Sequence, residues 1–354
     1  MGKMDLVFEK LKEVIEPTTG KDIVSLGLVK DVAIEGNKVS FVLSVPMGAN
    51  ADELRKAARH ALLQVDGIDV VSITIEGKKK IEPPKLRITD ESGKGKILGV
   101  KYIFAVGSGK GGVGKSTVAA NIAIAMKQLG YRVGLFDGDI YGPSIPKMLG
   151  LEGLVPRVED DKMIPVERYG VKVLSIGLMI EEDTPIIWRG PLVHKAYQQF
   201  FFDANWGDLD FLIVDFPPGT GDPQISAIQL VKLSGAVVVT TPQEVALADV
   251  RKAVRMFQKM SVDVIGVVEN MSYFRCPKCG HVARIFGEGG GEELKREMGI
   301  ELLGEIPIEP LIVKSGDTGV PITAYEPESE ASRVFRKIAA RIAEKIETRA
   351  KSVL

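Results

Sequence analysis

Nine consecutive residues, GKGGVGKST, have the types and spacing of a loop that binds phosphate. Four glycines let the backbone curl so that successive N–H groups point at phosphate oxygens. Lys115 would neutralise the β- and γ-phosphates, and the Ser116 hydroxyl would ligate Mg²⁺. The sequence therefore predicts binding of ATP with Mg²⁺ by Gly109, Lys110, Gly111, Gly112, Val113, Gly114, Lys115, Ser116 and Thr117.

The flanks of this loop support the same interpretation. The apolar run YIFAVG precedes it and a helical pattern follows, which is the strand–loop–helix context that the motif requires. The positive end of that helix would face the same phosphates. A glycine-rich turn beside a lysine is the alternative, and the agreement of both flanks disfavours it. By sequence alone, Lys110 is either solvated or directed at another nucleotide.

Two later acidic segments follow apolar runs and could complete a nucleotide site. VGLFDGD carries Asp137 and Asp139, and FLIVDF carries Asp215. An aspartate at the end of an apolar strand is the arrangement that holds the Mg²⁺ shell in P-loop proteins. The following loop, 217–222, could respond to the γ-phosphate. Taken one at a time, each aspartate could instead cap a turn.

The only two cysteines, Cys276 and Cys279, lie three residues apart. An iron–sulfur cluster usually needs four thiolates, so a cluster on this pair would bridge two chains related by a twofold axis. A bridging zinc ion, with His281 as a possible ligand, a dithiol redox pair and an inert pair remain as alternatives. No helix is expected to begin after Cys276 and lower its pKa, which disfavours the redox pair.

The pattern of apolar runs places these groups in an α/β fold. From Lys101 onward, short apolar runs alternate with helical segments, which predicts a mostly parallel sheet with helices on both faces. Residues 331–350 form an expected amphipathic helix. Residues 1–76 predict a smaller α+β domain of order α-β-β-α-β. Residues 77–99 are rich in Lys, Gly and Pro, as in a linker, so the larger domain covers residues 100–354.

Composition narrows the class of protein further. The formal charge of -1 gives no electrostatic reason to expect nucleic-acid binding, and no apolar stretch is long enough for a membrane span. The N-terminus lacks the apolar core of a secretory signal. We therefore expect a cytoplasmic protein that binds neither nucleic acid nor membrane.

With GKGGVGKST, DGDIYGPS, WRGP, DFPPGTGD and ENMSYFRCPKCG in this order, the chain resembles the Mrp/ApbC iron–sulfur carrier ATPases, which belong to the deviant Walker A class with MinD, ParA and the nitrogenase iron protein. The resemblance implies a homodimer that holds a [4Fe–4S] cluster at its interface, hydrolyses ATP slowly and transfers the cluster to apo-proteins. It implies that Lys110 reaches the partner's nucleotide and that Asp139 positions or activates the attacking water. It also implies that Asp215 anchors the γ-phosphate-sensing loop and that Asn270 bonds adenine.

The chain departs from the family pattern at few positions. Gly138 stands where the family usually has alanine, which should not disturb the site. The WRGP motif, residues 188–191, has no role that its chemistry assigns. Residues 1–76 resemble the MIP18-type domain, but residues 45–50 lack the cysteine that many such domains carry. The domain therefore cannot supply a thiol ligand there, and we expect it to act in docking or regulation.

A regulatory switch of the MinD/ParA kind, with a structural zinc or no metal, remains the alternative function. The C-terminal helix mixes basic residues with glutamates and fits a membrane-binding helix poorly. Catalysis on a small molecule is a weaker alternative, because no additional acid–base set is evident.

Overall fold

The structure is a computed structural model, and it describes residues 3–16, 20–44, 51–76, 94–179, 190–276 and 278–352. The chain divides into two compact units, Met1–Glu82 and Pro83–Leu354. Most of the predicted linker, Trp188 and Arg189 of the WRGP motif, and residues 45–50 lie outside the described residues.

The described part of the smaller unit consists of a three-stranded sheet, a separate antiparallel pair of two-residue strands and two helices. Strands β3 and β4 form the antiparallel hairpin predicted around residues 35–37, and β5 pairs with β4 in parallel. Helix α2 makes the crossover between them, as the order α-β-β-α-β requires. Buried apolar side chains from α1, α2 and the sheet form one core. The elements are α1 (Lys3–Leu11), β1 (Ile15–Glu16), β2 (Lys21–Asp22), β3 (Val29–Glu35), β4 (Lys38–Ser44), α2 (Ala51–Leu62) and β5 (Val70–Glu76).

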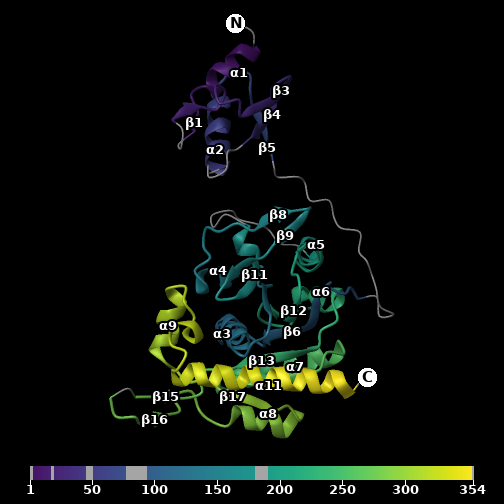
Figure 1. Cartoon of the computed structure of the whole chain (residues 1–354), viewed down its shortest axis with the longest axis vertical. Coiled ribbons are helices and arrows are strands. Elements are labelled where there is room, and N and C mark those ends of the chain that lie inside the picture. Colours follow the sequence, from purple (N-terminus) through teal and green to yellow (C-terminus); the bar gives the residue numbers. More distant parts are fainter. Residues whose placement is uncertain are drawn as a thin grey trace. The chain divides into compact units, whose positions relative to one another are not determined.

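The larger unit alternates strands and helices along the chain (Figure 1). Its strands are β6 (Val100–Ser108), β7 (Val133–Asp137), β8 (Arg157–Glu159), β9 (Lys162–Ile164), β10 (Val166–Arg168), β11 (Val171–Ser175), β12 (Leu209–Asp215), β13 (Gly235–Thr240), β14 (Val264–Glu269), β15 (Phe274–Arg275), β16 (Val282–Ala283) and β17 (Leu302–Glu305). Its helices are α3 (Lys115–Gln128), α4 (Ile145–Met148), α5 (Gly190–Phe202), α6 (Asp222–Leu230), α7 (Glu244–Lys259), α8 (Gly290–Met298), α9 (Pro310–Asp317), α10 (Ile322–Tyr325) and α11 (Glu330–Ser352), with a 3₁₀ turn at Ile176–Leu178.

Eight strands form the central sheet in the order β10-β11-β7-β12-β6-β13-β14-β17. Every neighbouring pair is parallel except β10 with β11, which is antiparallel. The prediction of an α/β fold with a mostly parallel sheet is therefore confirmed. The apolar runs predicted the six inner strands. Both edge strands were missed, because β10 is three residues long with exposed charged side chains and β17 ends in a glycine and a glutamate.

Alternate residues of the inner strands feed two separate cores, one on each face of the sheet. Leu212 and Val214 of β12 face the core built with α5, α6 and α7, whereas Phe211 and Ile213 face the core built with α3 and α11. Helix α3 packs against the long C-terminal helix α11, drawn in yellow (Figure 1). Burial on both faces explains why these strands read as continuous apolar runs.

A short antiparallel hairpin, β15–β16, carries the cysteine pair. It pairs Phe274 with Ala283 and Arg275 with Val282, next to the first turn of α11 (Figure 1). None of the helices in the described parts of the chain is long and apolar enough to cross a membrane.

Candidate functional site

The predicted nucleotide-binding groups meet at the carboxyl edge of the sheet. Strand β12 lies between β7 and β6, and the register places Asp215 beside Asp137 on one side and Val106 on the other. The phosphate loop leaves β6 two residues beyond Val106. Parallel neighbours therefore bring together side chains that are about a hundred residues apart in sequence. Ligands of open α/β sheets bind at this edge, where the chain reverses its strand order.

The phosphate loop needs its glycines for both conformation and space. Gly112 and Gly114 have φ angles of 79° and 80°, which favour glycine. A Cβ on Gly109 would collide with the backbone of Asp249, and a Cβ on Gly114 would collide with the amide of Asn270. Helix α3 begins directly after Gly114 without a side-chain cap. Its first N–H groups are therefore available to an anion.

Lys115 lies at the centre of the site in a buried ion pair. Its Nζ is 2.7 Å from Oδ1 of Asp215 and 3.6 Å from Oδ2 of Asp139, and it donates to the Ser116 hydroxyl at 3.0 Å. Lys115 is 6% exposed and Asp215 is fully buried. The lysine that the sequence assigns to phosphate thus rests on the two carboxylates that the sequence assigns to Mg²⁺ and water.

Three carboxylates share this one buried cation. Burial, followed by the charge of Asp215, raises the pKa of Asp137 to about 7, and burial also raises the pKa of Asp139 above its ordinary value. Oδ2 of Asp215 is buried without a hydrogen-bond partner in the described chain. The site therefore has surplus negative charge and an unused carboxylate oxygen, which fit a hydrated divalent cation.

Asn270 and Lys110 border the loop from different directions. Asn270 follows β14, and its Nδ2 donates to the carbonyl of Val113 at 2.9 Å. Its side chain therefore holds the phosphate loop in this structure, and its predicted bond to adenine stays a prediction. Lys110 is partly exposed, and its ammonium has no hydrogen bond or ion pair with any described residue. Both alternatives for Lys110, solvation and contact with another nucleotide, are compatible with this state.

Three residues that the sequence reasoning missed hold the acidic segments in place. Ser175, at the end of β11, donates to Oδ2 of Asp137 at 2.9 Å, and the Tyr197 hydroxyl donates to the carbonyl of Gly138 at 2.7 Å. Gln224 donates to the carbonyls of residues 217, 218 and 219 at 2.8–3.1 Å. Ser175 had a sequence signal, since it is the polar end of the run VKVLS on a neighbouring strand.

Gly138 is more constrained than its sequence indicated. A Cβ at this position would lie 3.0 Å from the carbonyl oxygen of Asp215 and 3.4 Å from the Tyr197 hydroxyl. An alanine would therefore require these neighbours to shift by a few tenths of an ångström.

The cysteine pair sits at the tip of the β15–β16 hairpin. The Cys276 N–H donates to the carbonyl of His281 and the Gly280 N–H donates to the carbonyl of Cys276, both at 2.9 Å. The backbone N–H of Cys279, then that of Lys278, and the Cys279 thiol lower the pKa of Cys276. The turn itself therefore favours the thiolate without a helix, which the sequence reasoning did not foresee. Cys276 is partly exposed and Cys279 is exposed.

The described residues hold no group of three or more His, Cys, Asp or Glu side chains arranged for a metal ion. The cysteine pair thus offers two sulfur ligands from one chain. The backbone of His281 contributes its carbonyl to the hairpin. Trp188 and Arg189, whose role the sequence left open, lie outside the described residues.

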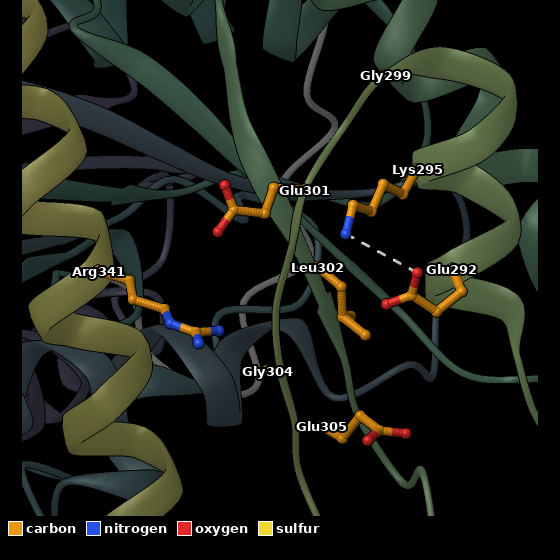
Figure 2. Close-up of a pocket in the computed structure, with 8 residues that line it drawn as sticks. All are labelled: Glu292, Lys295, Gly299, Glu301, Leu302, Gly304, Glu305 and Arg341. Atoms are coloured by element: carbon orange, nitrogen blue, oxygen red, sulfur yellow. Dashed lines mark ion pairs between the residues drawn. The ribbon is translucent and has the colours of Figure 1, made fainter.

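A separate hollow of about 560 Å³ lies along the edge strand β17 (Figure 2). Glu292 and Lys295 of α8 border it on one side and Arg341 of α11 on the other, with Leu302 between them. None of the site residues predicted from the sequence lines it. Glu305, at its lower end in the figure, connects it to the cysteine hairpin through Arg284, at 2.8 Å.

The parallel sheet, the phosphate loop after its strand β6 and the acidic ends of β7 and β12 define a P-loop NTPase. Comparison with known proteins narrows this class. The family model described as NUBPL iron-transfer P-loop NTPase matches residues 99–343, and the model described as iron-sulfur cluster assembly protein matches residues 5–75. The chain belongs to the family of NUBPL iron-transfer P-loop NTPases, and the resemblance to Mrp/ApbC proteins with a MIP18-type domain is confirmed.

Individual relatives agree with this assignment. The iron-sulfur cluster carrier protein of Aquifex aeolicus is 45% identical, over 99% of this chain and 100% of its own length. That of Pyrococcus horikoshii is 50% identical over 70% of this chain and 87% of its own. A nucleotide-binding protein from Archaeoglobus fulgidus, solved in complex with ADP, is 41% identical with a TM-score of 0.60, over 70% of this chain and 98% of its own. The cell division ATPase MinD of Pyrococcus furiosus, at 24% identity and a TM-score of 0.52, shares the fold.

Asp137 should make the stability of the larger unit depend on pH. Its pKa of about 7 in the folded chain exceeds the ordinary value of 3.8. Between these values the unfolded chain has already released a proton that the folded chain retains. The free energy of unfolding should therefore fall as pH rises from about 4 to about 7. Asp137→Asn should make this slope shallower.

Urea unfolding at about pH 5, 6 and 7 measures the slope. Tryptophan fluorescence reports on the larger unit alone, because both tryptophans, Trp188 and Trp206, belong to it. The comparison is between the slopes of unfolding free energy against pH in the wild type and in Asp137→Asn. A constant change in stability from the hydrogen bonds of the introduced amide does not alter this slope. Equal slopes in the two proteins would contradict this role of Asp137.

Proposed function

We propose that this protein is an ATP-hydrolysing iron–sulfur cluster carrier of the cytoplasm, which holds a [4Fe–4S] cluster between two copies of the chain and transfers it to apo-proteins. The observation that carries the proposal is the combination, in one unit, of a P-loop site with a solvent-accessible pair of cysteines on a hairpin turn whose N–H groups lower the pKa of Cys276. Membership of the iron-transfer family and the names of the relatives support the cargo.

The site residues would have separate roles in binding the phosphates of ATP and in binding Mg²⁺. The N–H groups of residues 109–117 and the Nζ of Lys115 would bind the phosphates, and Ser116 and Asp215 would hold Mg²⁺, directly or through its waters. Mg²⁺ supplies charge neutralisation between the β- and γ-phosphates. Because Lys115 is paired with Asp215, it would exchange one anionic partner for another when nucleotide binds. That exchange frees the Asp215 carboxylate and so couples the nucleotide to the 217–222 loop.

Asp139 would orient the water that attacks the γ-phosphorus. Its pKa is raised by burial, so it is a better proton acceptor than an exposed aspartate. Lys110, whose ammonium is unpaired among the described residues, would reach the nucleotide of the second copy. Two facing sites would then share their catalytic lysines, and hydrolysis would alter the contact between the copies.

The cluster is the cargo of this function. Two thiolates per chain are half of what a [4Fe–4S] cluster requires, and a twofold axis supplies the other half. The exposure of Cys279 at a hairpin tip suits transfer, because recipient thiolates must replace these ligands one by one. In that exchange, each iron–sulfur bond that breaks on the carrier is replaced by one on the recipient, and no net oxidation is needed.

Substitution of the two lysines of the phosphate loop should impair different functions. Lys115→Ala should abolish nucleotide binding, because the cation that faces the phosphates is lost. Lys110→Ala should retain binding within a few-fold and lose hydrolysis by about 10³-fold, the typical effect of a charge supplied in trans. Fluorescent-nucleotide titration and phosphate release measure these quantities.

The controls follow from the geometry. Lys115→Ala leaves Asp215 buried and unpaired, so thermal unfolding should accompany the titration to show that the fold persists. Lys110 is partly exposed and serves as the matched substitution in the same loop. An equal loss of binding in both variants would argue against the role of Lys110 on the second copy.

Metal analysis tests the cargo. Anaerobically purified protein should carry about two irons and two sulfides per chain, which is one four-iron cluster per dimer. Cys276→Ser/Cys279→Ser should carry neither, while still binding nucleotide. Iron, sulfide and zinc are measured per chain on both proteins.

About half a zinc per chain without sulfide would mean a structural bridge of four thiolates and would overturn the carrier function. Iron and sulfide that persist in the double variant would place the cluster elsewhere on the chain. Size-exclusion chromatography with light scattering on the same samples shows whether the metal-loaded form is a dimer.

A further inference from the structure

The nucleotide site and the cysteine pair are joined by a very short stretch of chain. Asn270, whose amide holds the phosphate loop, and Cys276 are separated only by residues 271–275. Met271, the first of these, has a φ of 55°, an uncommon conformation for a residue with a side chain. The segment that joins Asn270 to the cysteine pair therefore begins in an uncommon backbone conformation.

Residues 271–275 run beside the residues that follow the edge strand β17, and backbone hydrogen bonds join the two segments. The Ser272 N–H donates to the carbonyl of Ile306 at 2.9 Å, and the Ile308 N–H donates to the carbonyl of Tyr273 at 2.6 Å. Phe274 forms a bridge with Ile308. The segment from Asn270 to the hairpin is thus held by backbone contacts on one side, and its polar side chains determine how the other side is held.

Buried polar side chains form a second connection between the two sites. The Ser272 hydroxyl is fully buried, 2.5 Å from Oε1 of Glu269 and 2.8 Å from Oε1 of Glu305. Glu269 immediately precedes Asn270 and also accepts the N–H of Gly291 at 2.9 Å. A hydroxyl has one proton, so Ser272 donates to one of the two carboxylates at a time. The arrangement has two alternative hydrogen-bonded states.

Arg284 extends this connection to the hairpin that carries the cysteines. It directly follows β16, and its Nη1 is 2.8 Å from the same Oε1 of Glu305 and 3.5 Å from the Ser272 hydroxyl. Glu305 is 35% exposed and also borders the hollow along β17, so it has room to change its side-chain conformation (Figure 2). Because Ser272 and Arg284 contact the same Oε1, the partner that Ser272 chooses changes the number of hydrogen bonds on the oxygen that faces Arg284.

We propose that Ser272 and Arg284 are positioning residues that pass the nucleotide state at Asn270 to the Cys276–Cys279 turn. With Ser272 bonded to Glu269, Glu305 is fully available to Arg284 and holds the hairpin. With Ser272 bonded to Glu305, that hold weakens and the turn opens. The role in cluster handover rests on the proposed function, but the connection itself concerns two thiols and a nucleotide and can be tested without a cluster.

The thiols provide a specific readout, because the chain has only two cysteines. The experiment uses the full-length, metal-free protein and an aromatic disulfide reagent, with and without Mg·ATP. In the wild type, nucleotide should change the rate of thiol modification on the order of fivefold, within the usual range of coupling between sites. In Ser272→Ala and Arg284→Gln the ratio of the two rates should fall to about one. Nucleotide affinity, measured separately, should stay within a few-fold.

Arg275→Gln is the matched control on the same hairpin. Arg275 pairs with Glu330 of α11 at 3.0 Å and takes no part in the connection through Glu305. This variant should keep the nucleotide response of the wild type. Arg284→Lys should restore part of the response that Arg284→Gln loses, because a cation again faces Glu305.

Each outcome decides the proposal. Unchanged ratios in Ser272→Ala and Arg284→Gln would overturn it, as would an equal loss in Arg275→Gln, which would indicate general loosening of the hairpin. A wild type whose thiols do not respond to nucleotide would also overturn it. If instead the thiols respond as expected but the purified protein holds no iron and sulfide, the carrier function fails while the connection between the two sites stands.

Discussion

The buried ion pair between Lys115 and Asp215 is the interaction on which the rest of the site depends. A charge of either sign at this depth is costly unless the other is present, so neither residue is acceptable alone. The pair joins the helix after β6 to the end of β12, and Asp139 adds a second carboxylate from the turn after β7. Asp215 thus satisfies the phosphate lysine within the chain itself. In the proposed function, nucleotide would give the same lysine phosphate oxygens to face, and Asp215 would take another partner. The proposed sensor would then use the same atoms that bind the ligand.

The sheet makes this pairing possible because it fixes register across three parallel strands. Two apolar cores, one on each face, hold β6, β7 and β12 in the register that places Asp215 between Val106 and Asp137. Individual hydrogen bonds then position the acidic residues at the ends of these strands. Ser175 and the backbone of Ile145 bond to Asp137, and Tyr197 bonds to Gly138. These groups come from elements on both sides of the acidic turn, so its geometry is set by the whole fold and not by the local sequence.

The sequence was sufficient for the interior of the sheet and for the loop, but not for the contacts between them. Strands buried on both faces read as apolar runs, and a glycine-rich loop between a strand and a helix has few other interpretations. The edge strands β10 and β17 gave no such signal, because one side of each lies at the rim of the sheet. The role of Gln224 could not have been assigned from the sequence. No local motif indicates that its side-chain amide donates to the carbonyls of residues 217, 218 and 219. The lowered pKa of Cys276 likewise comes from N–H groups whose direction the turn alone decides.

The contrast between apolar and polar contacts explains how one rigid fold can still carry a signal. The two cores leave little freedom to the strands, so a change at the phosphate loop cannot be passed on by moving the sheet. The described residues from Asn270 to Arg284, directly after β14, belong to neither core and are held instead by hydrogen bonds and ion pairs, one of them to the partly exposed side chain of Glu305. Such contacts exchange partners at small free-energy cost. A nucleotide-dependent change is therefore expected where the polar contacts begin, in the few residues between Asn270 and Cys276. These residues also lead directly into the hairpin that carries the two thiols.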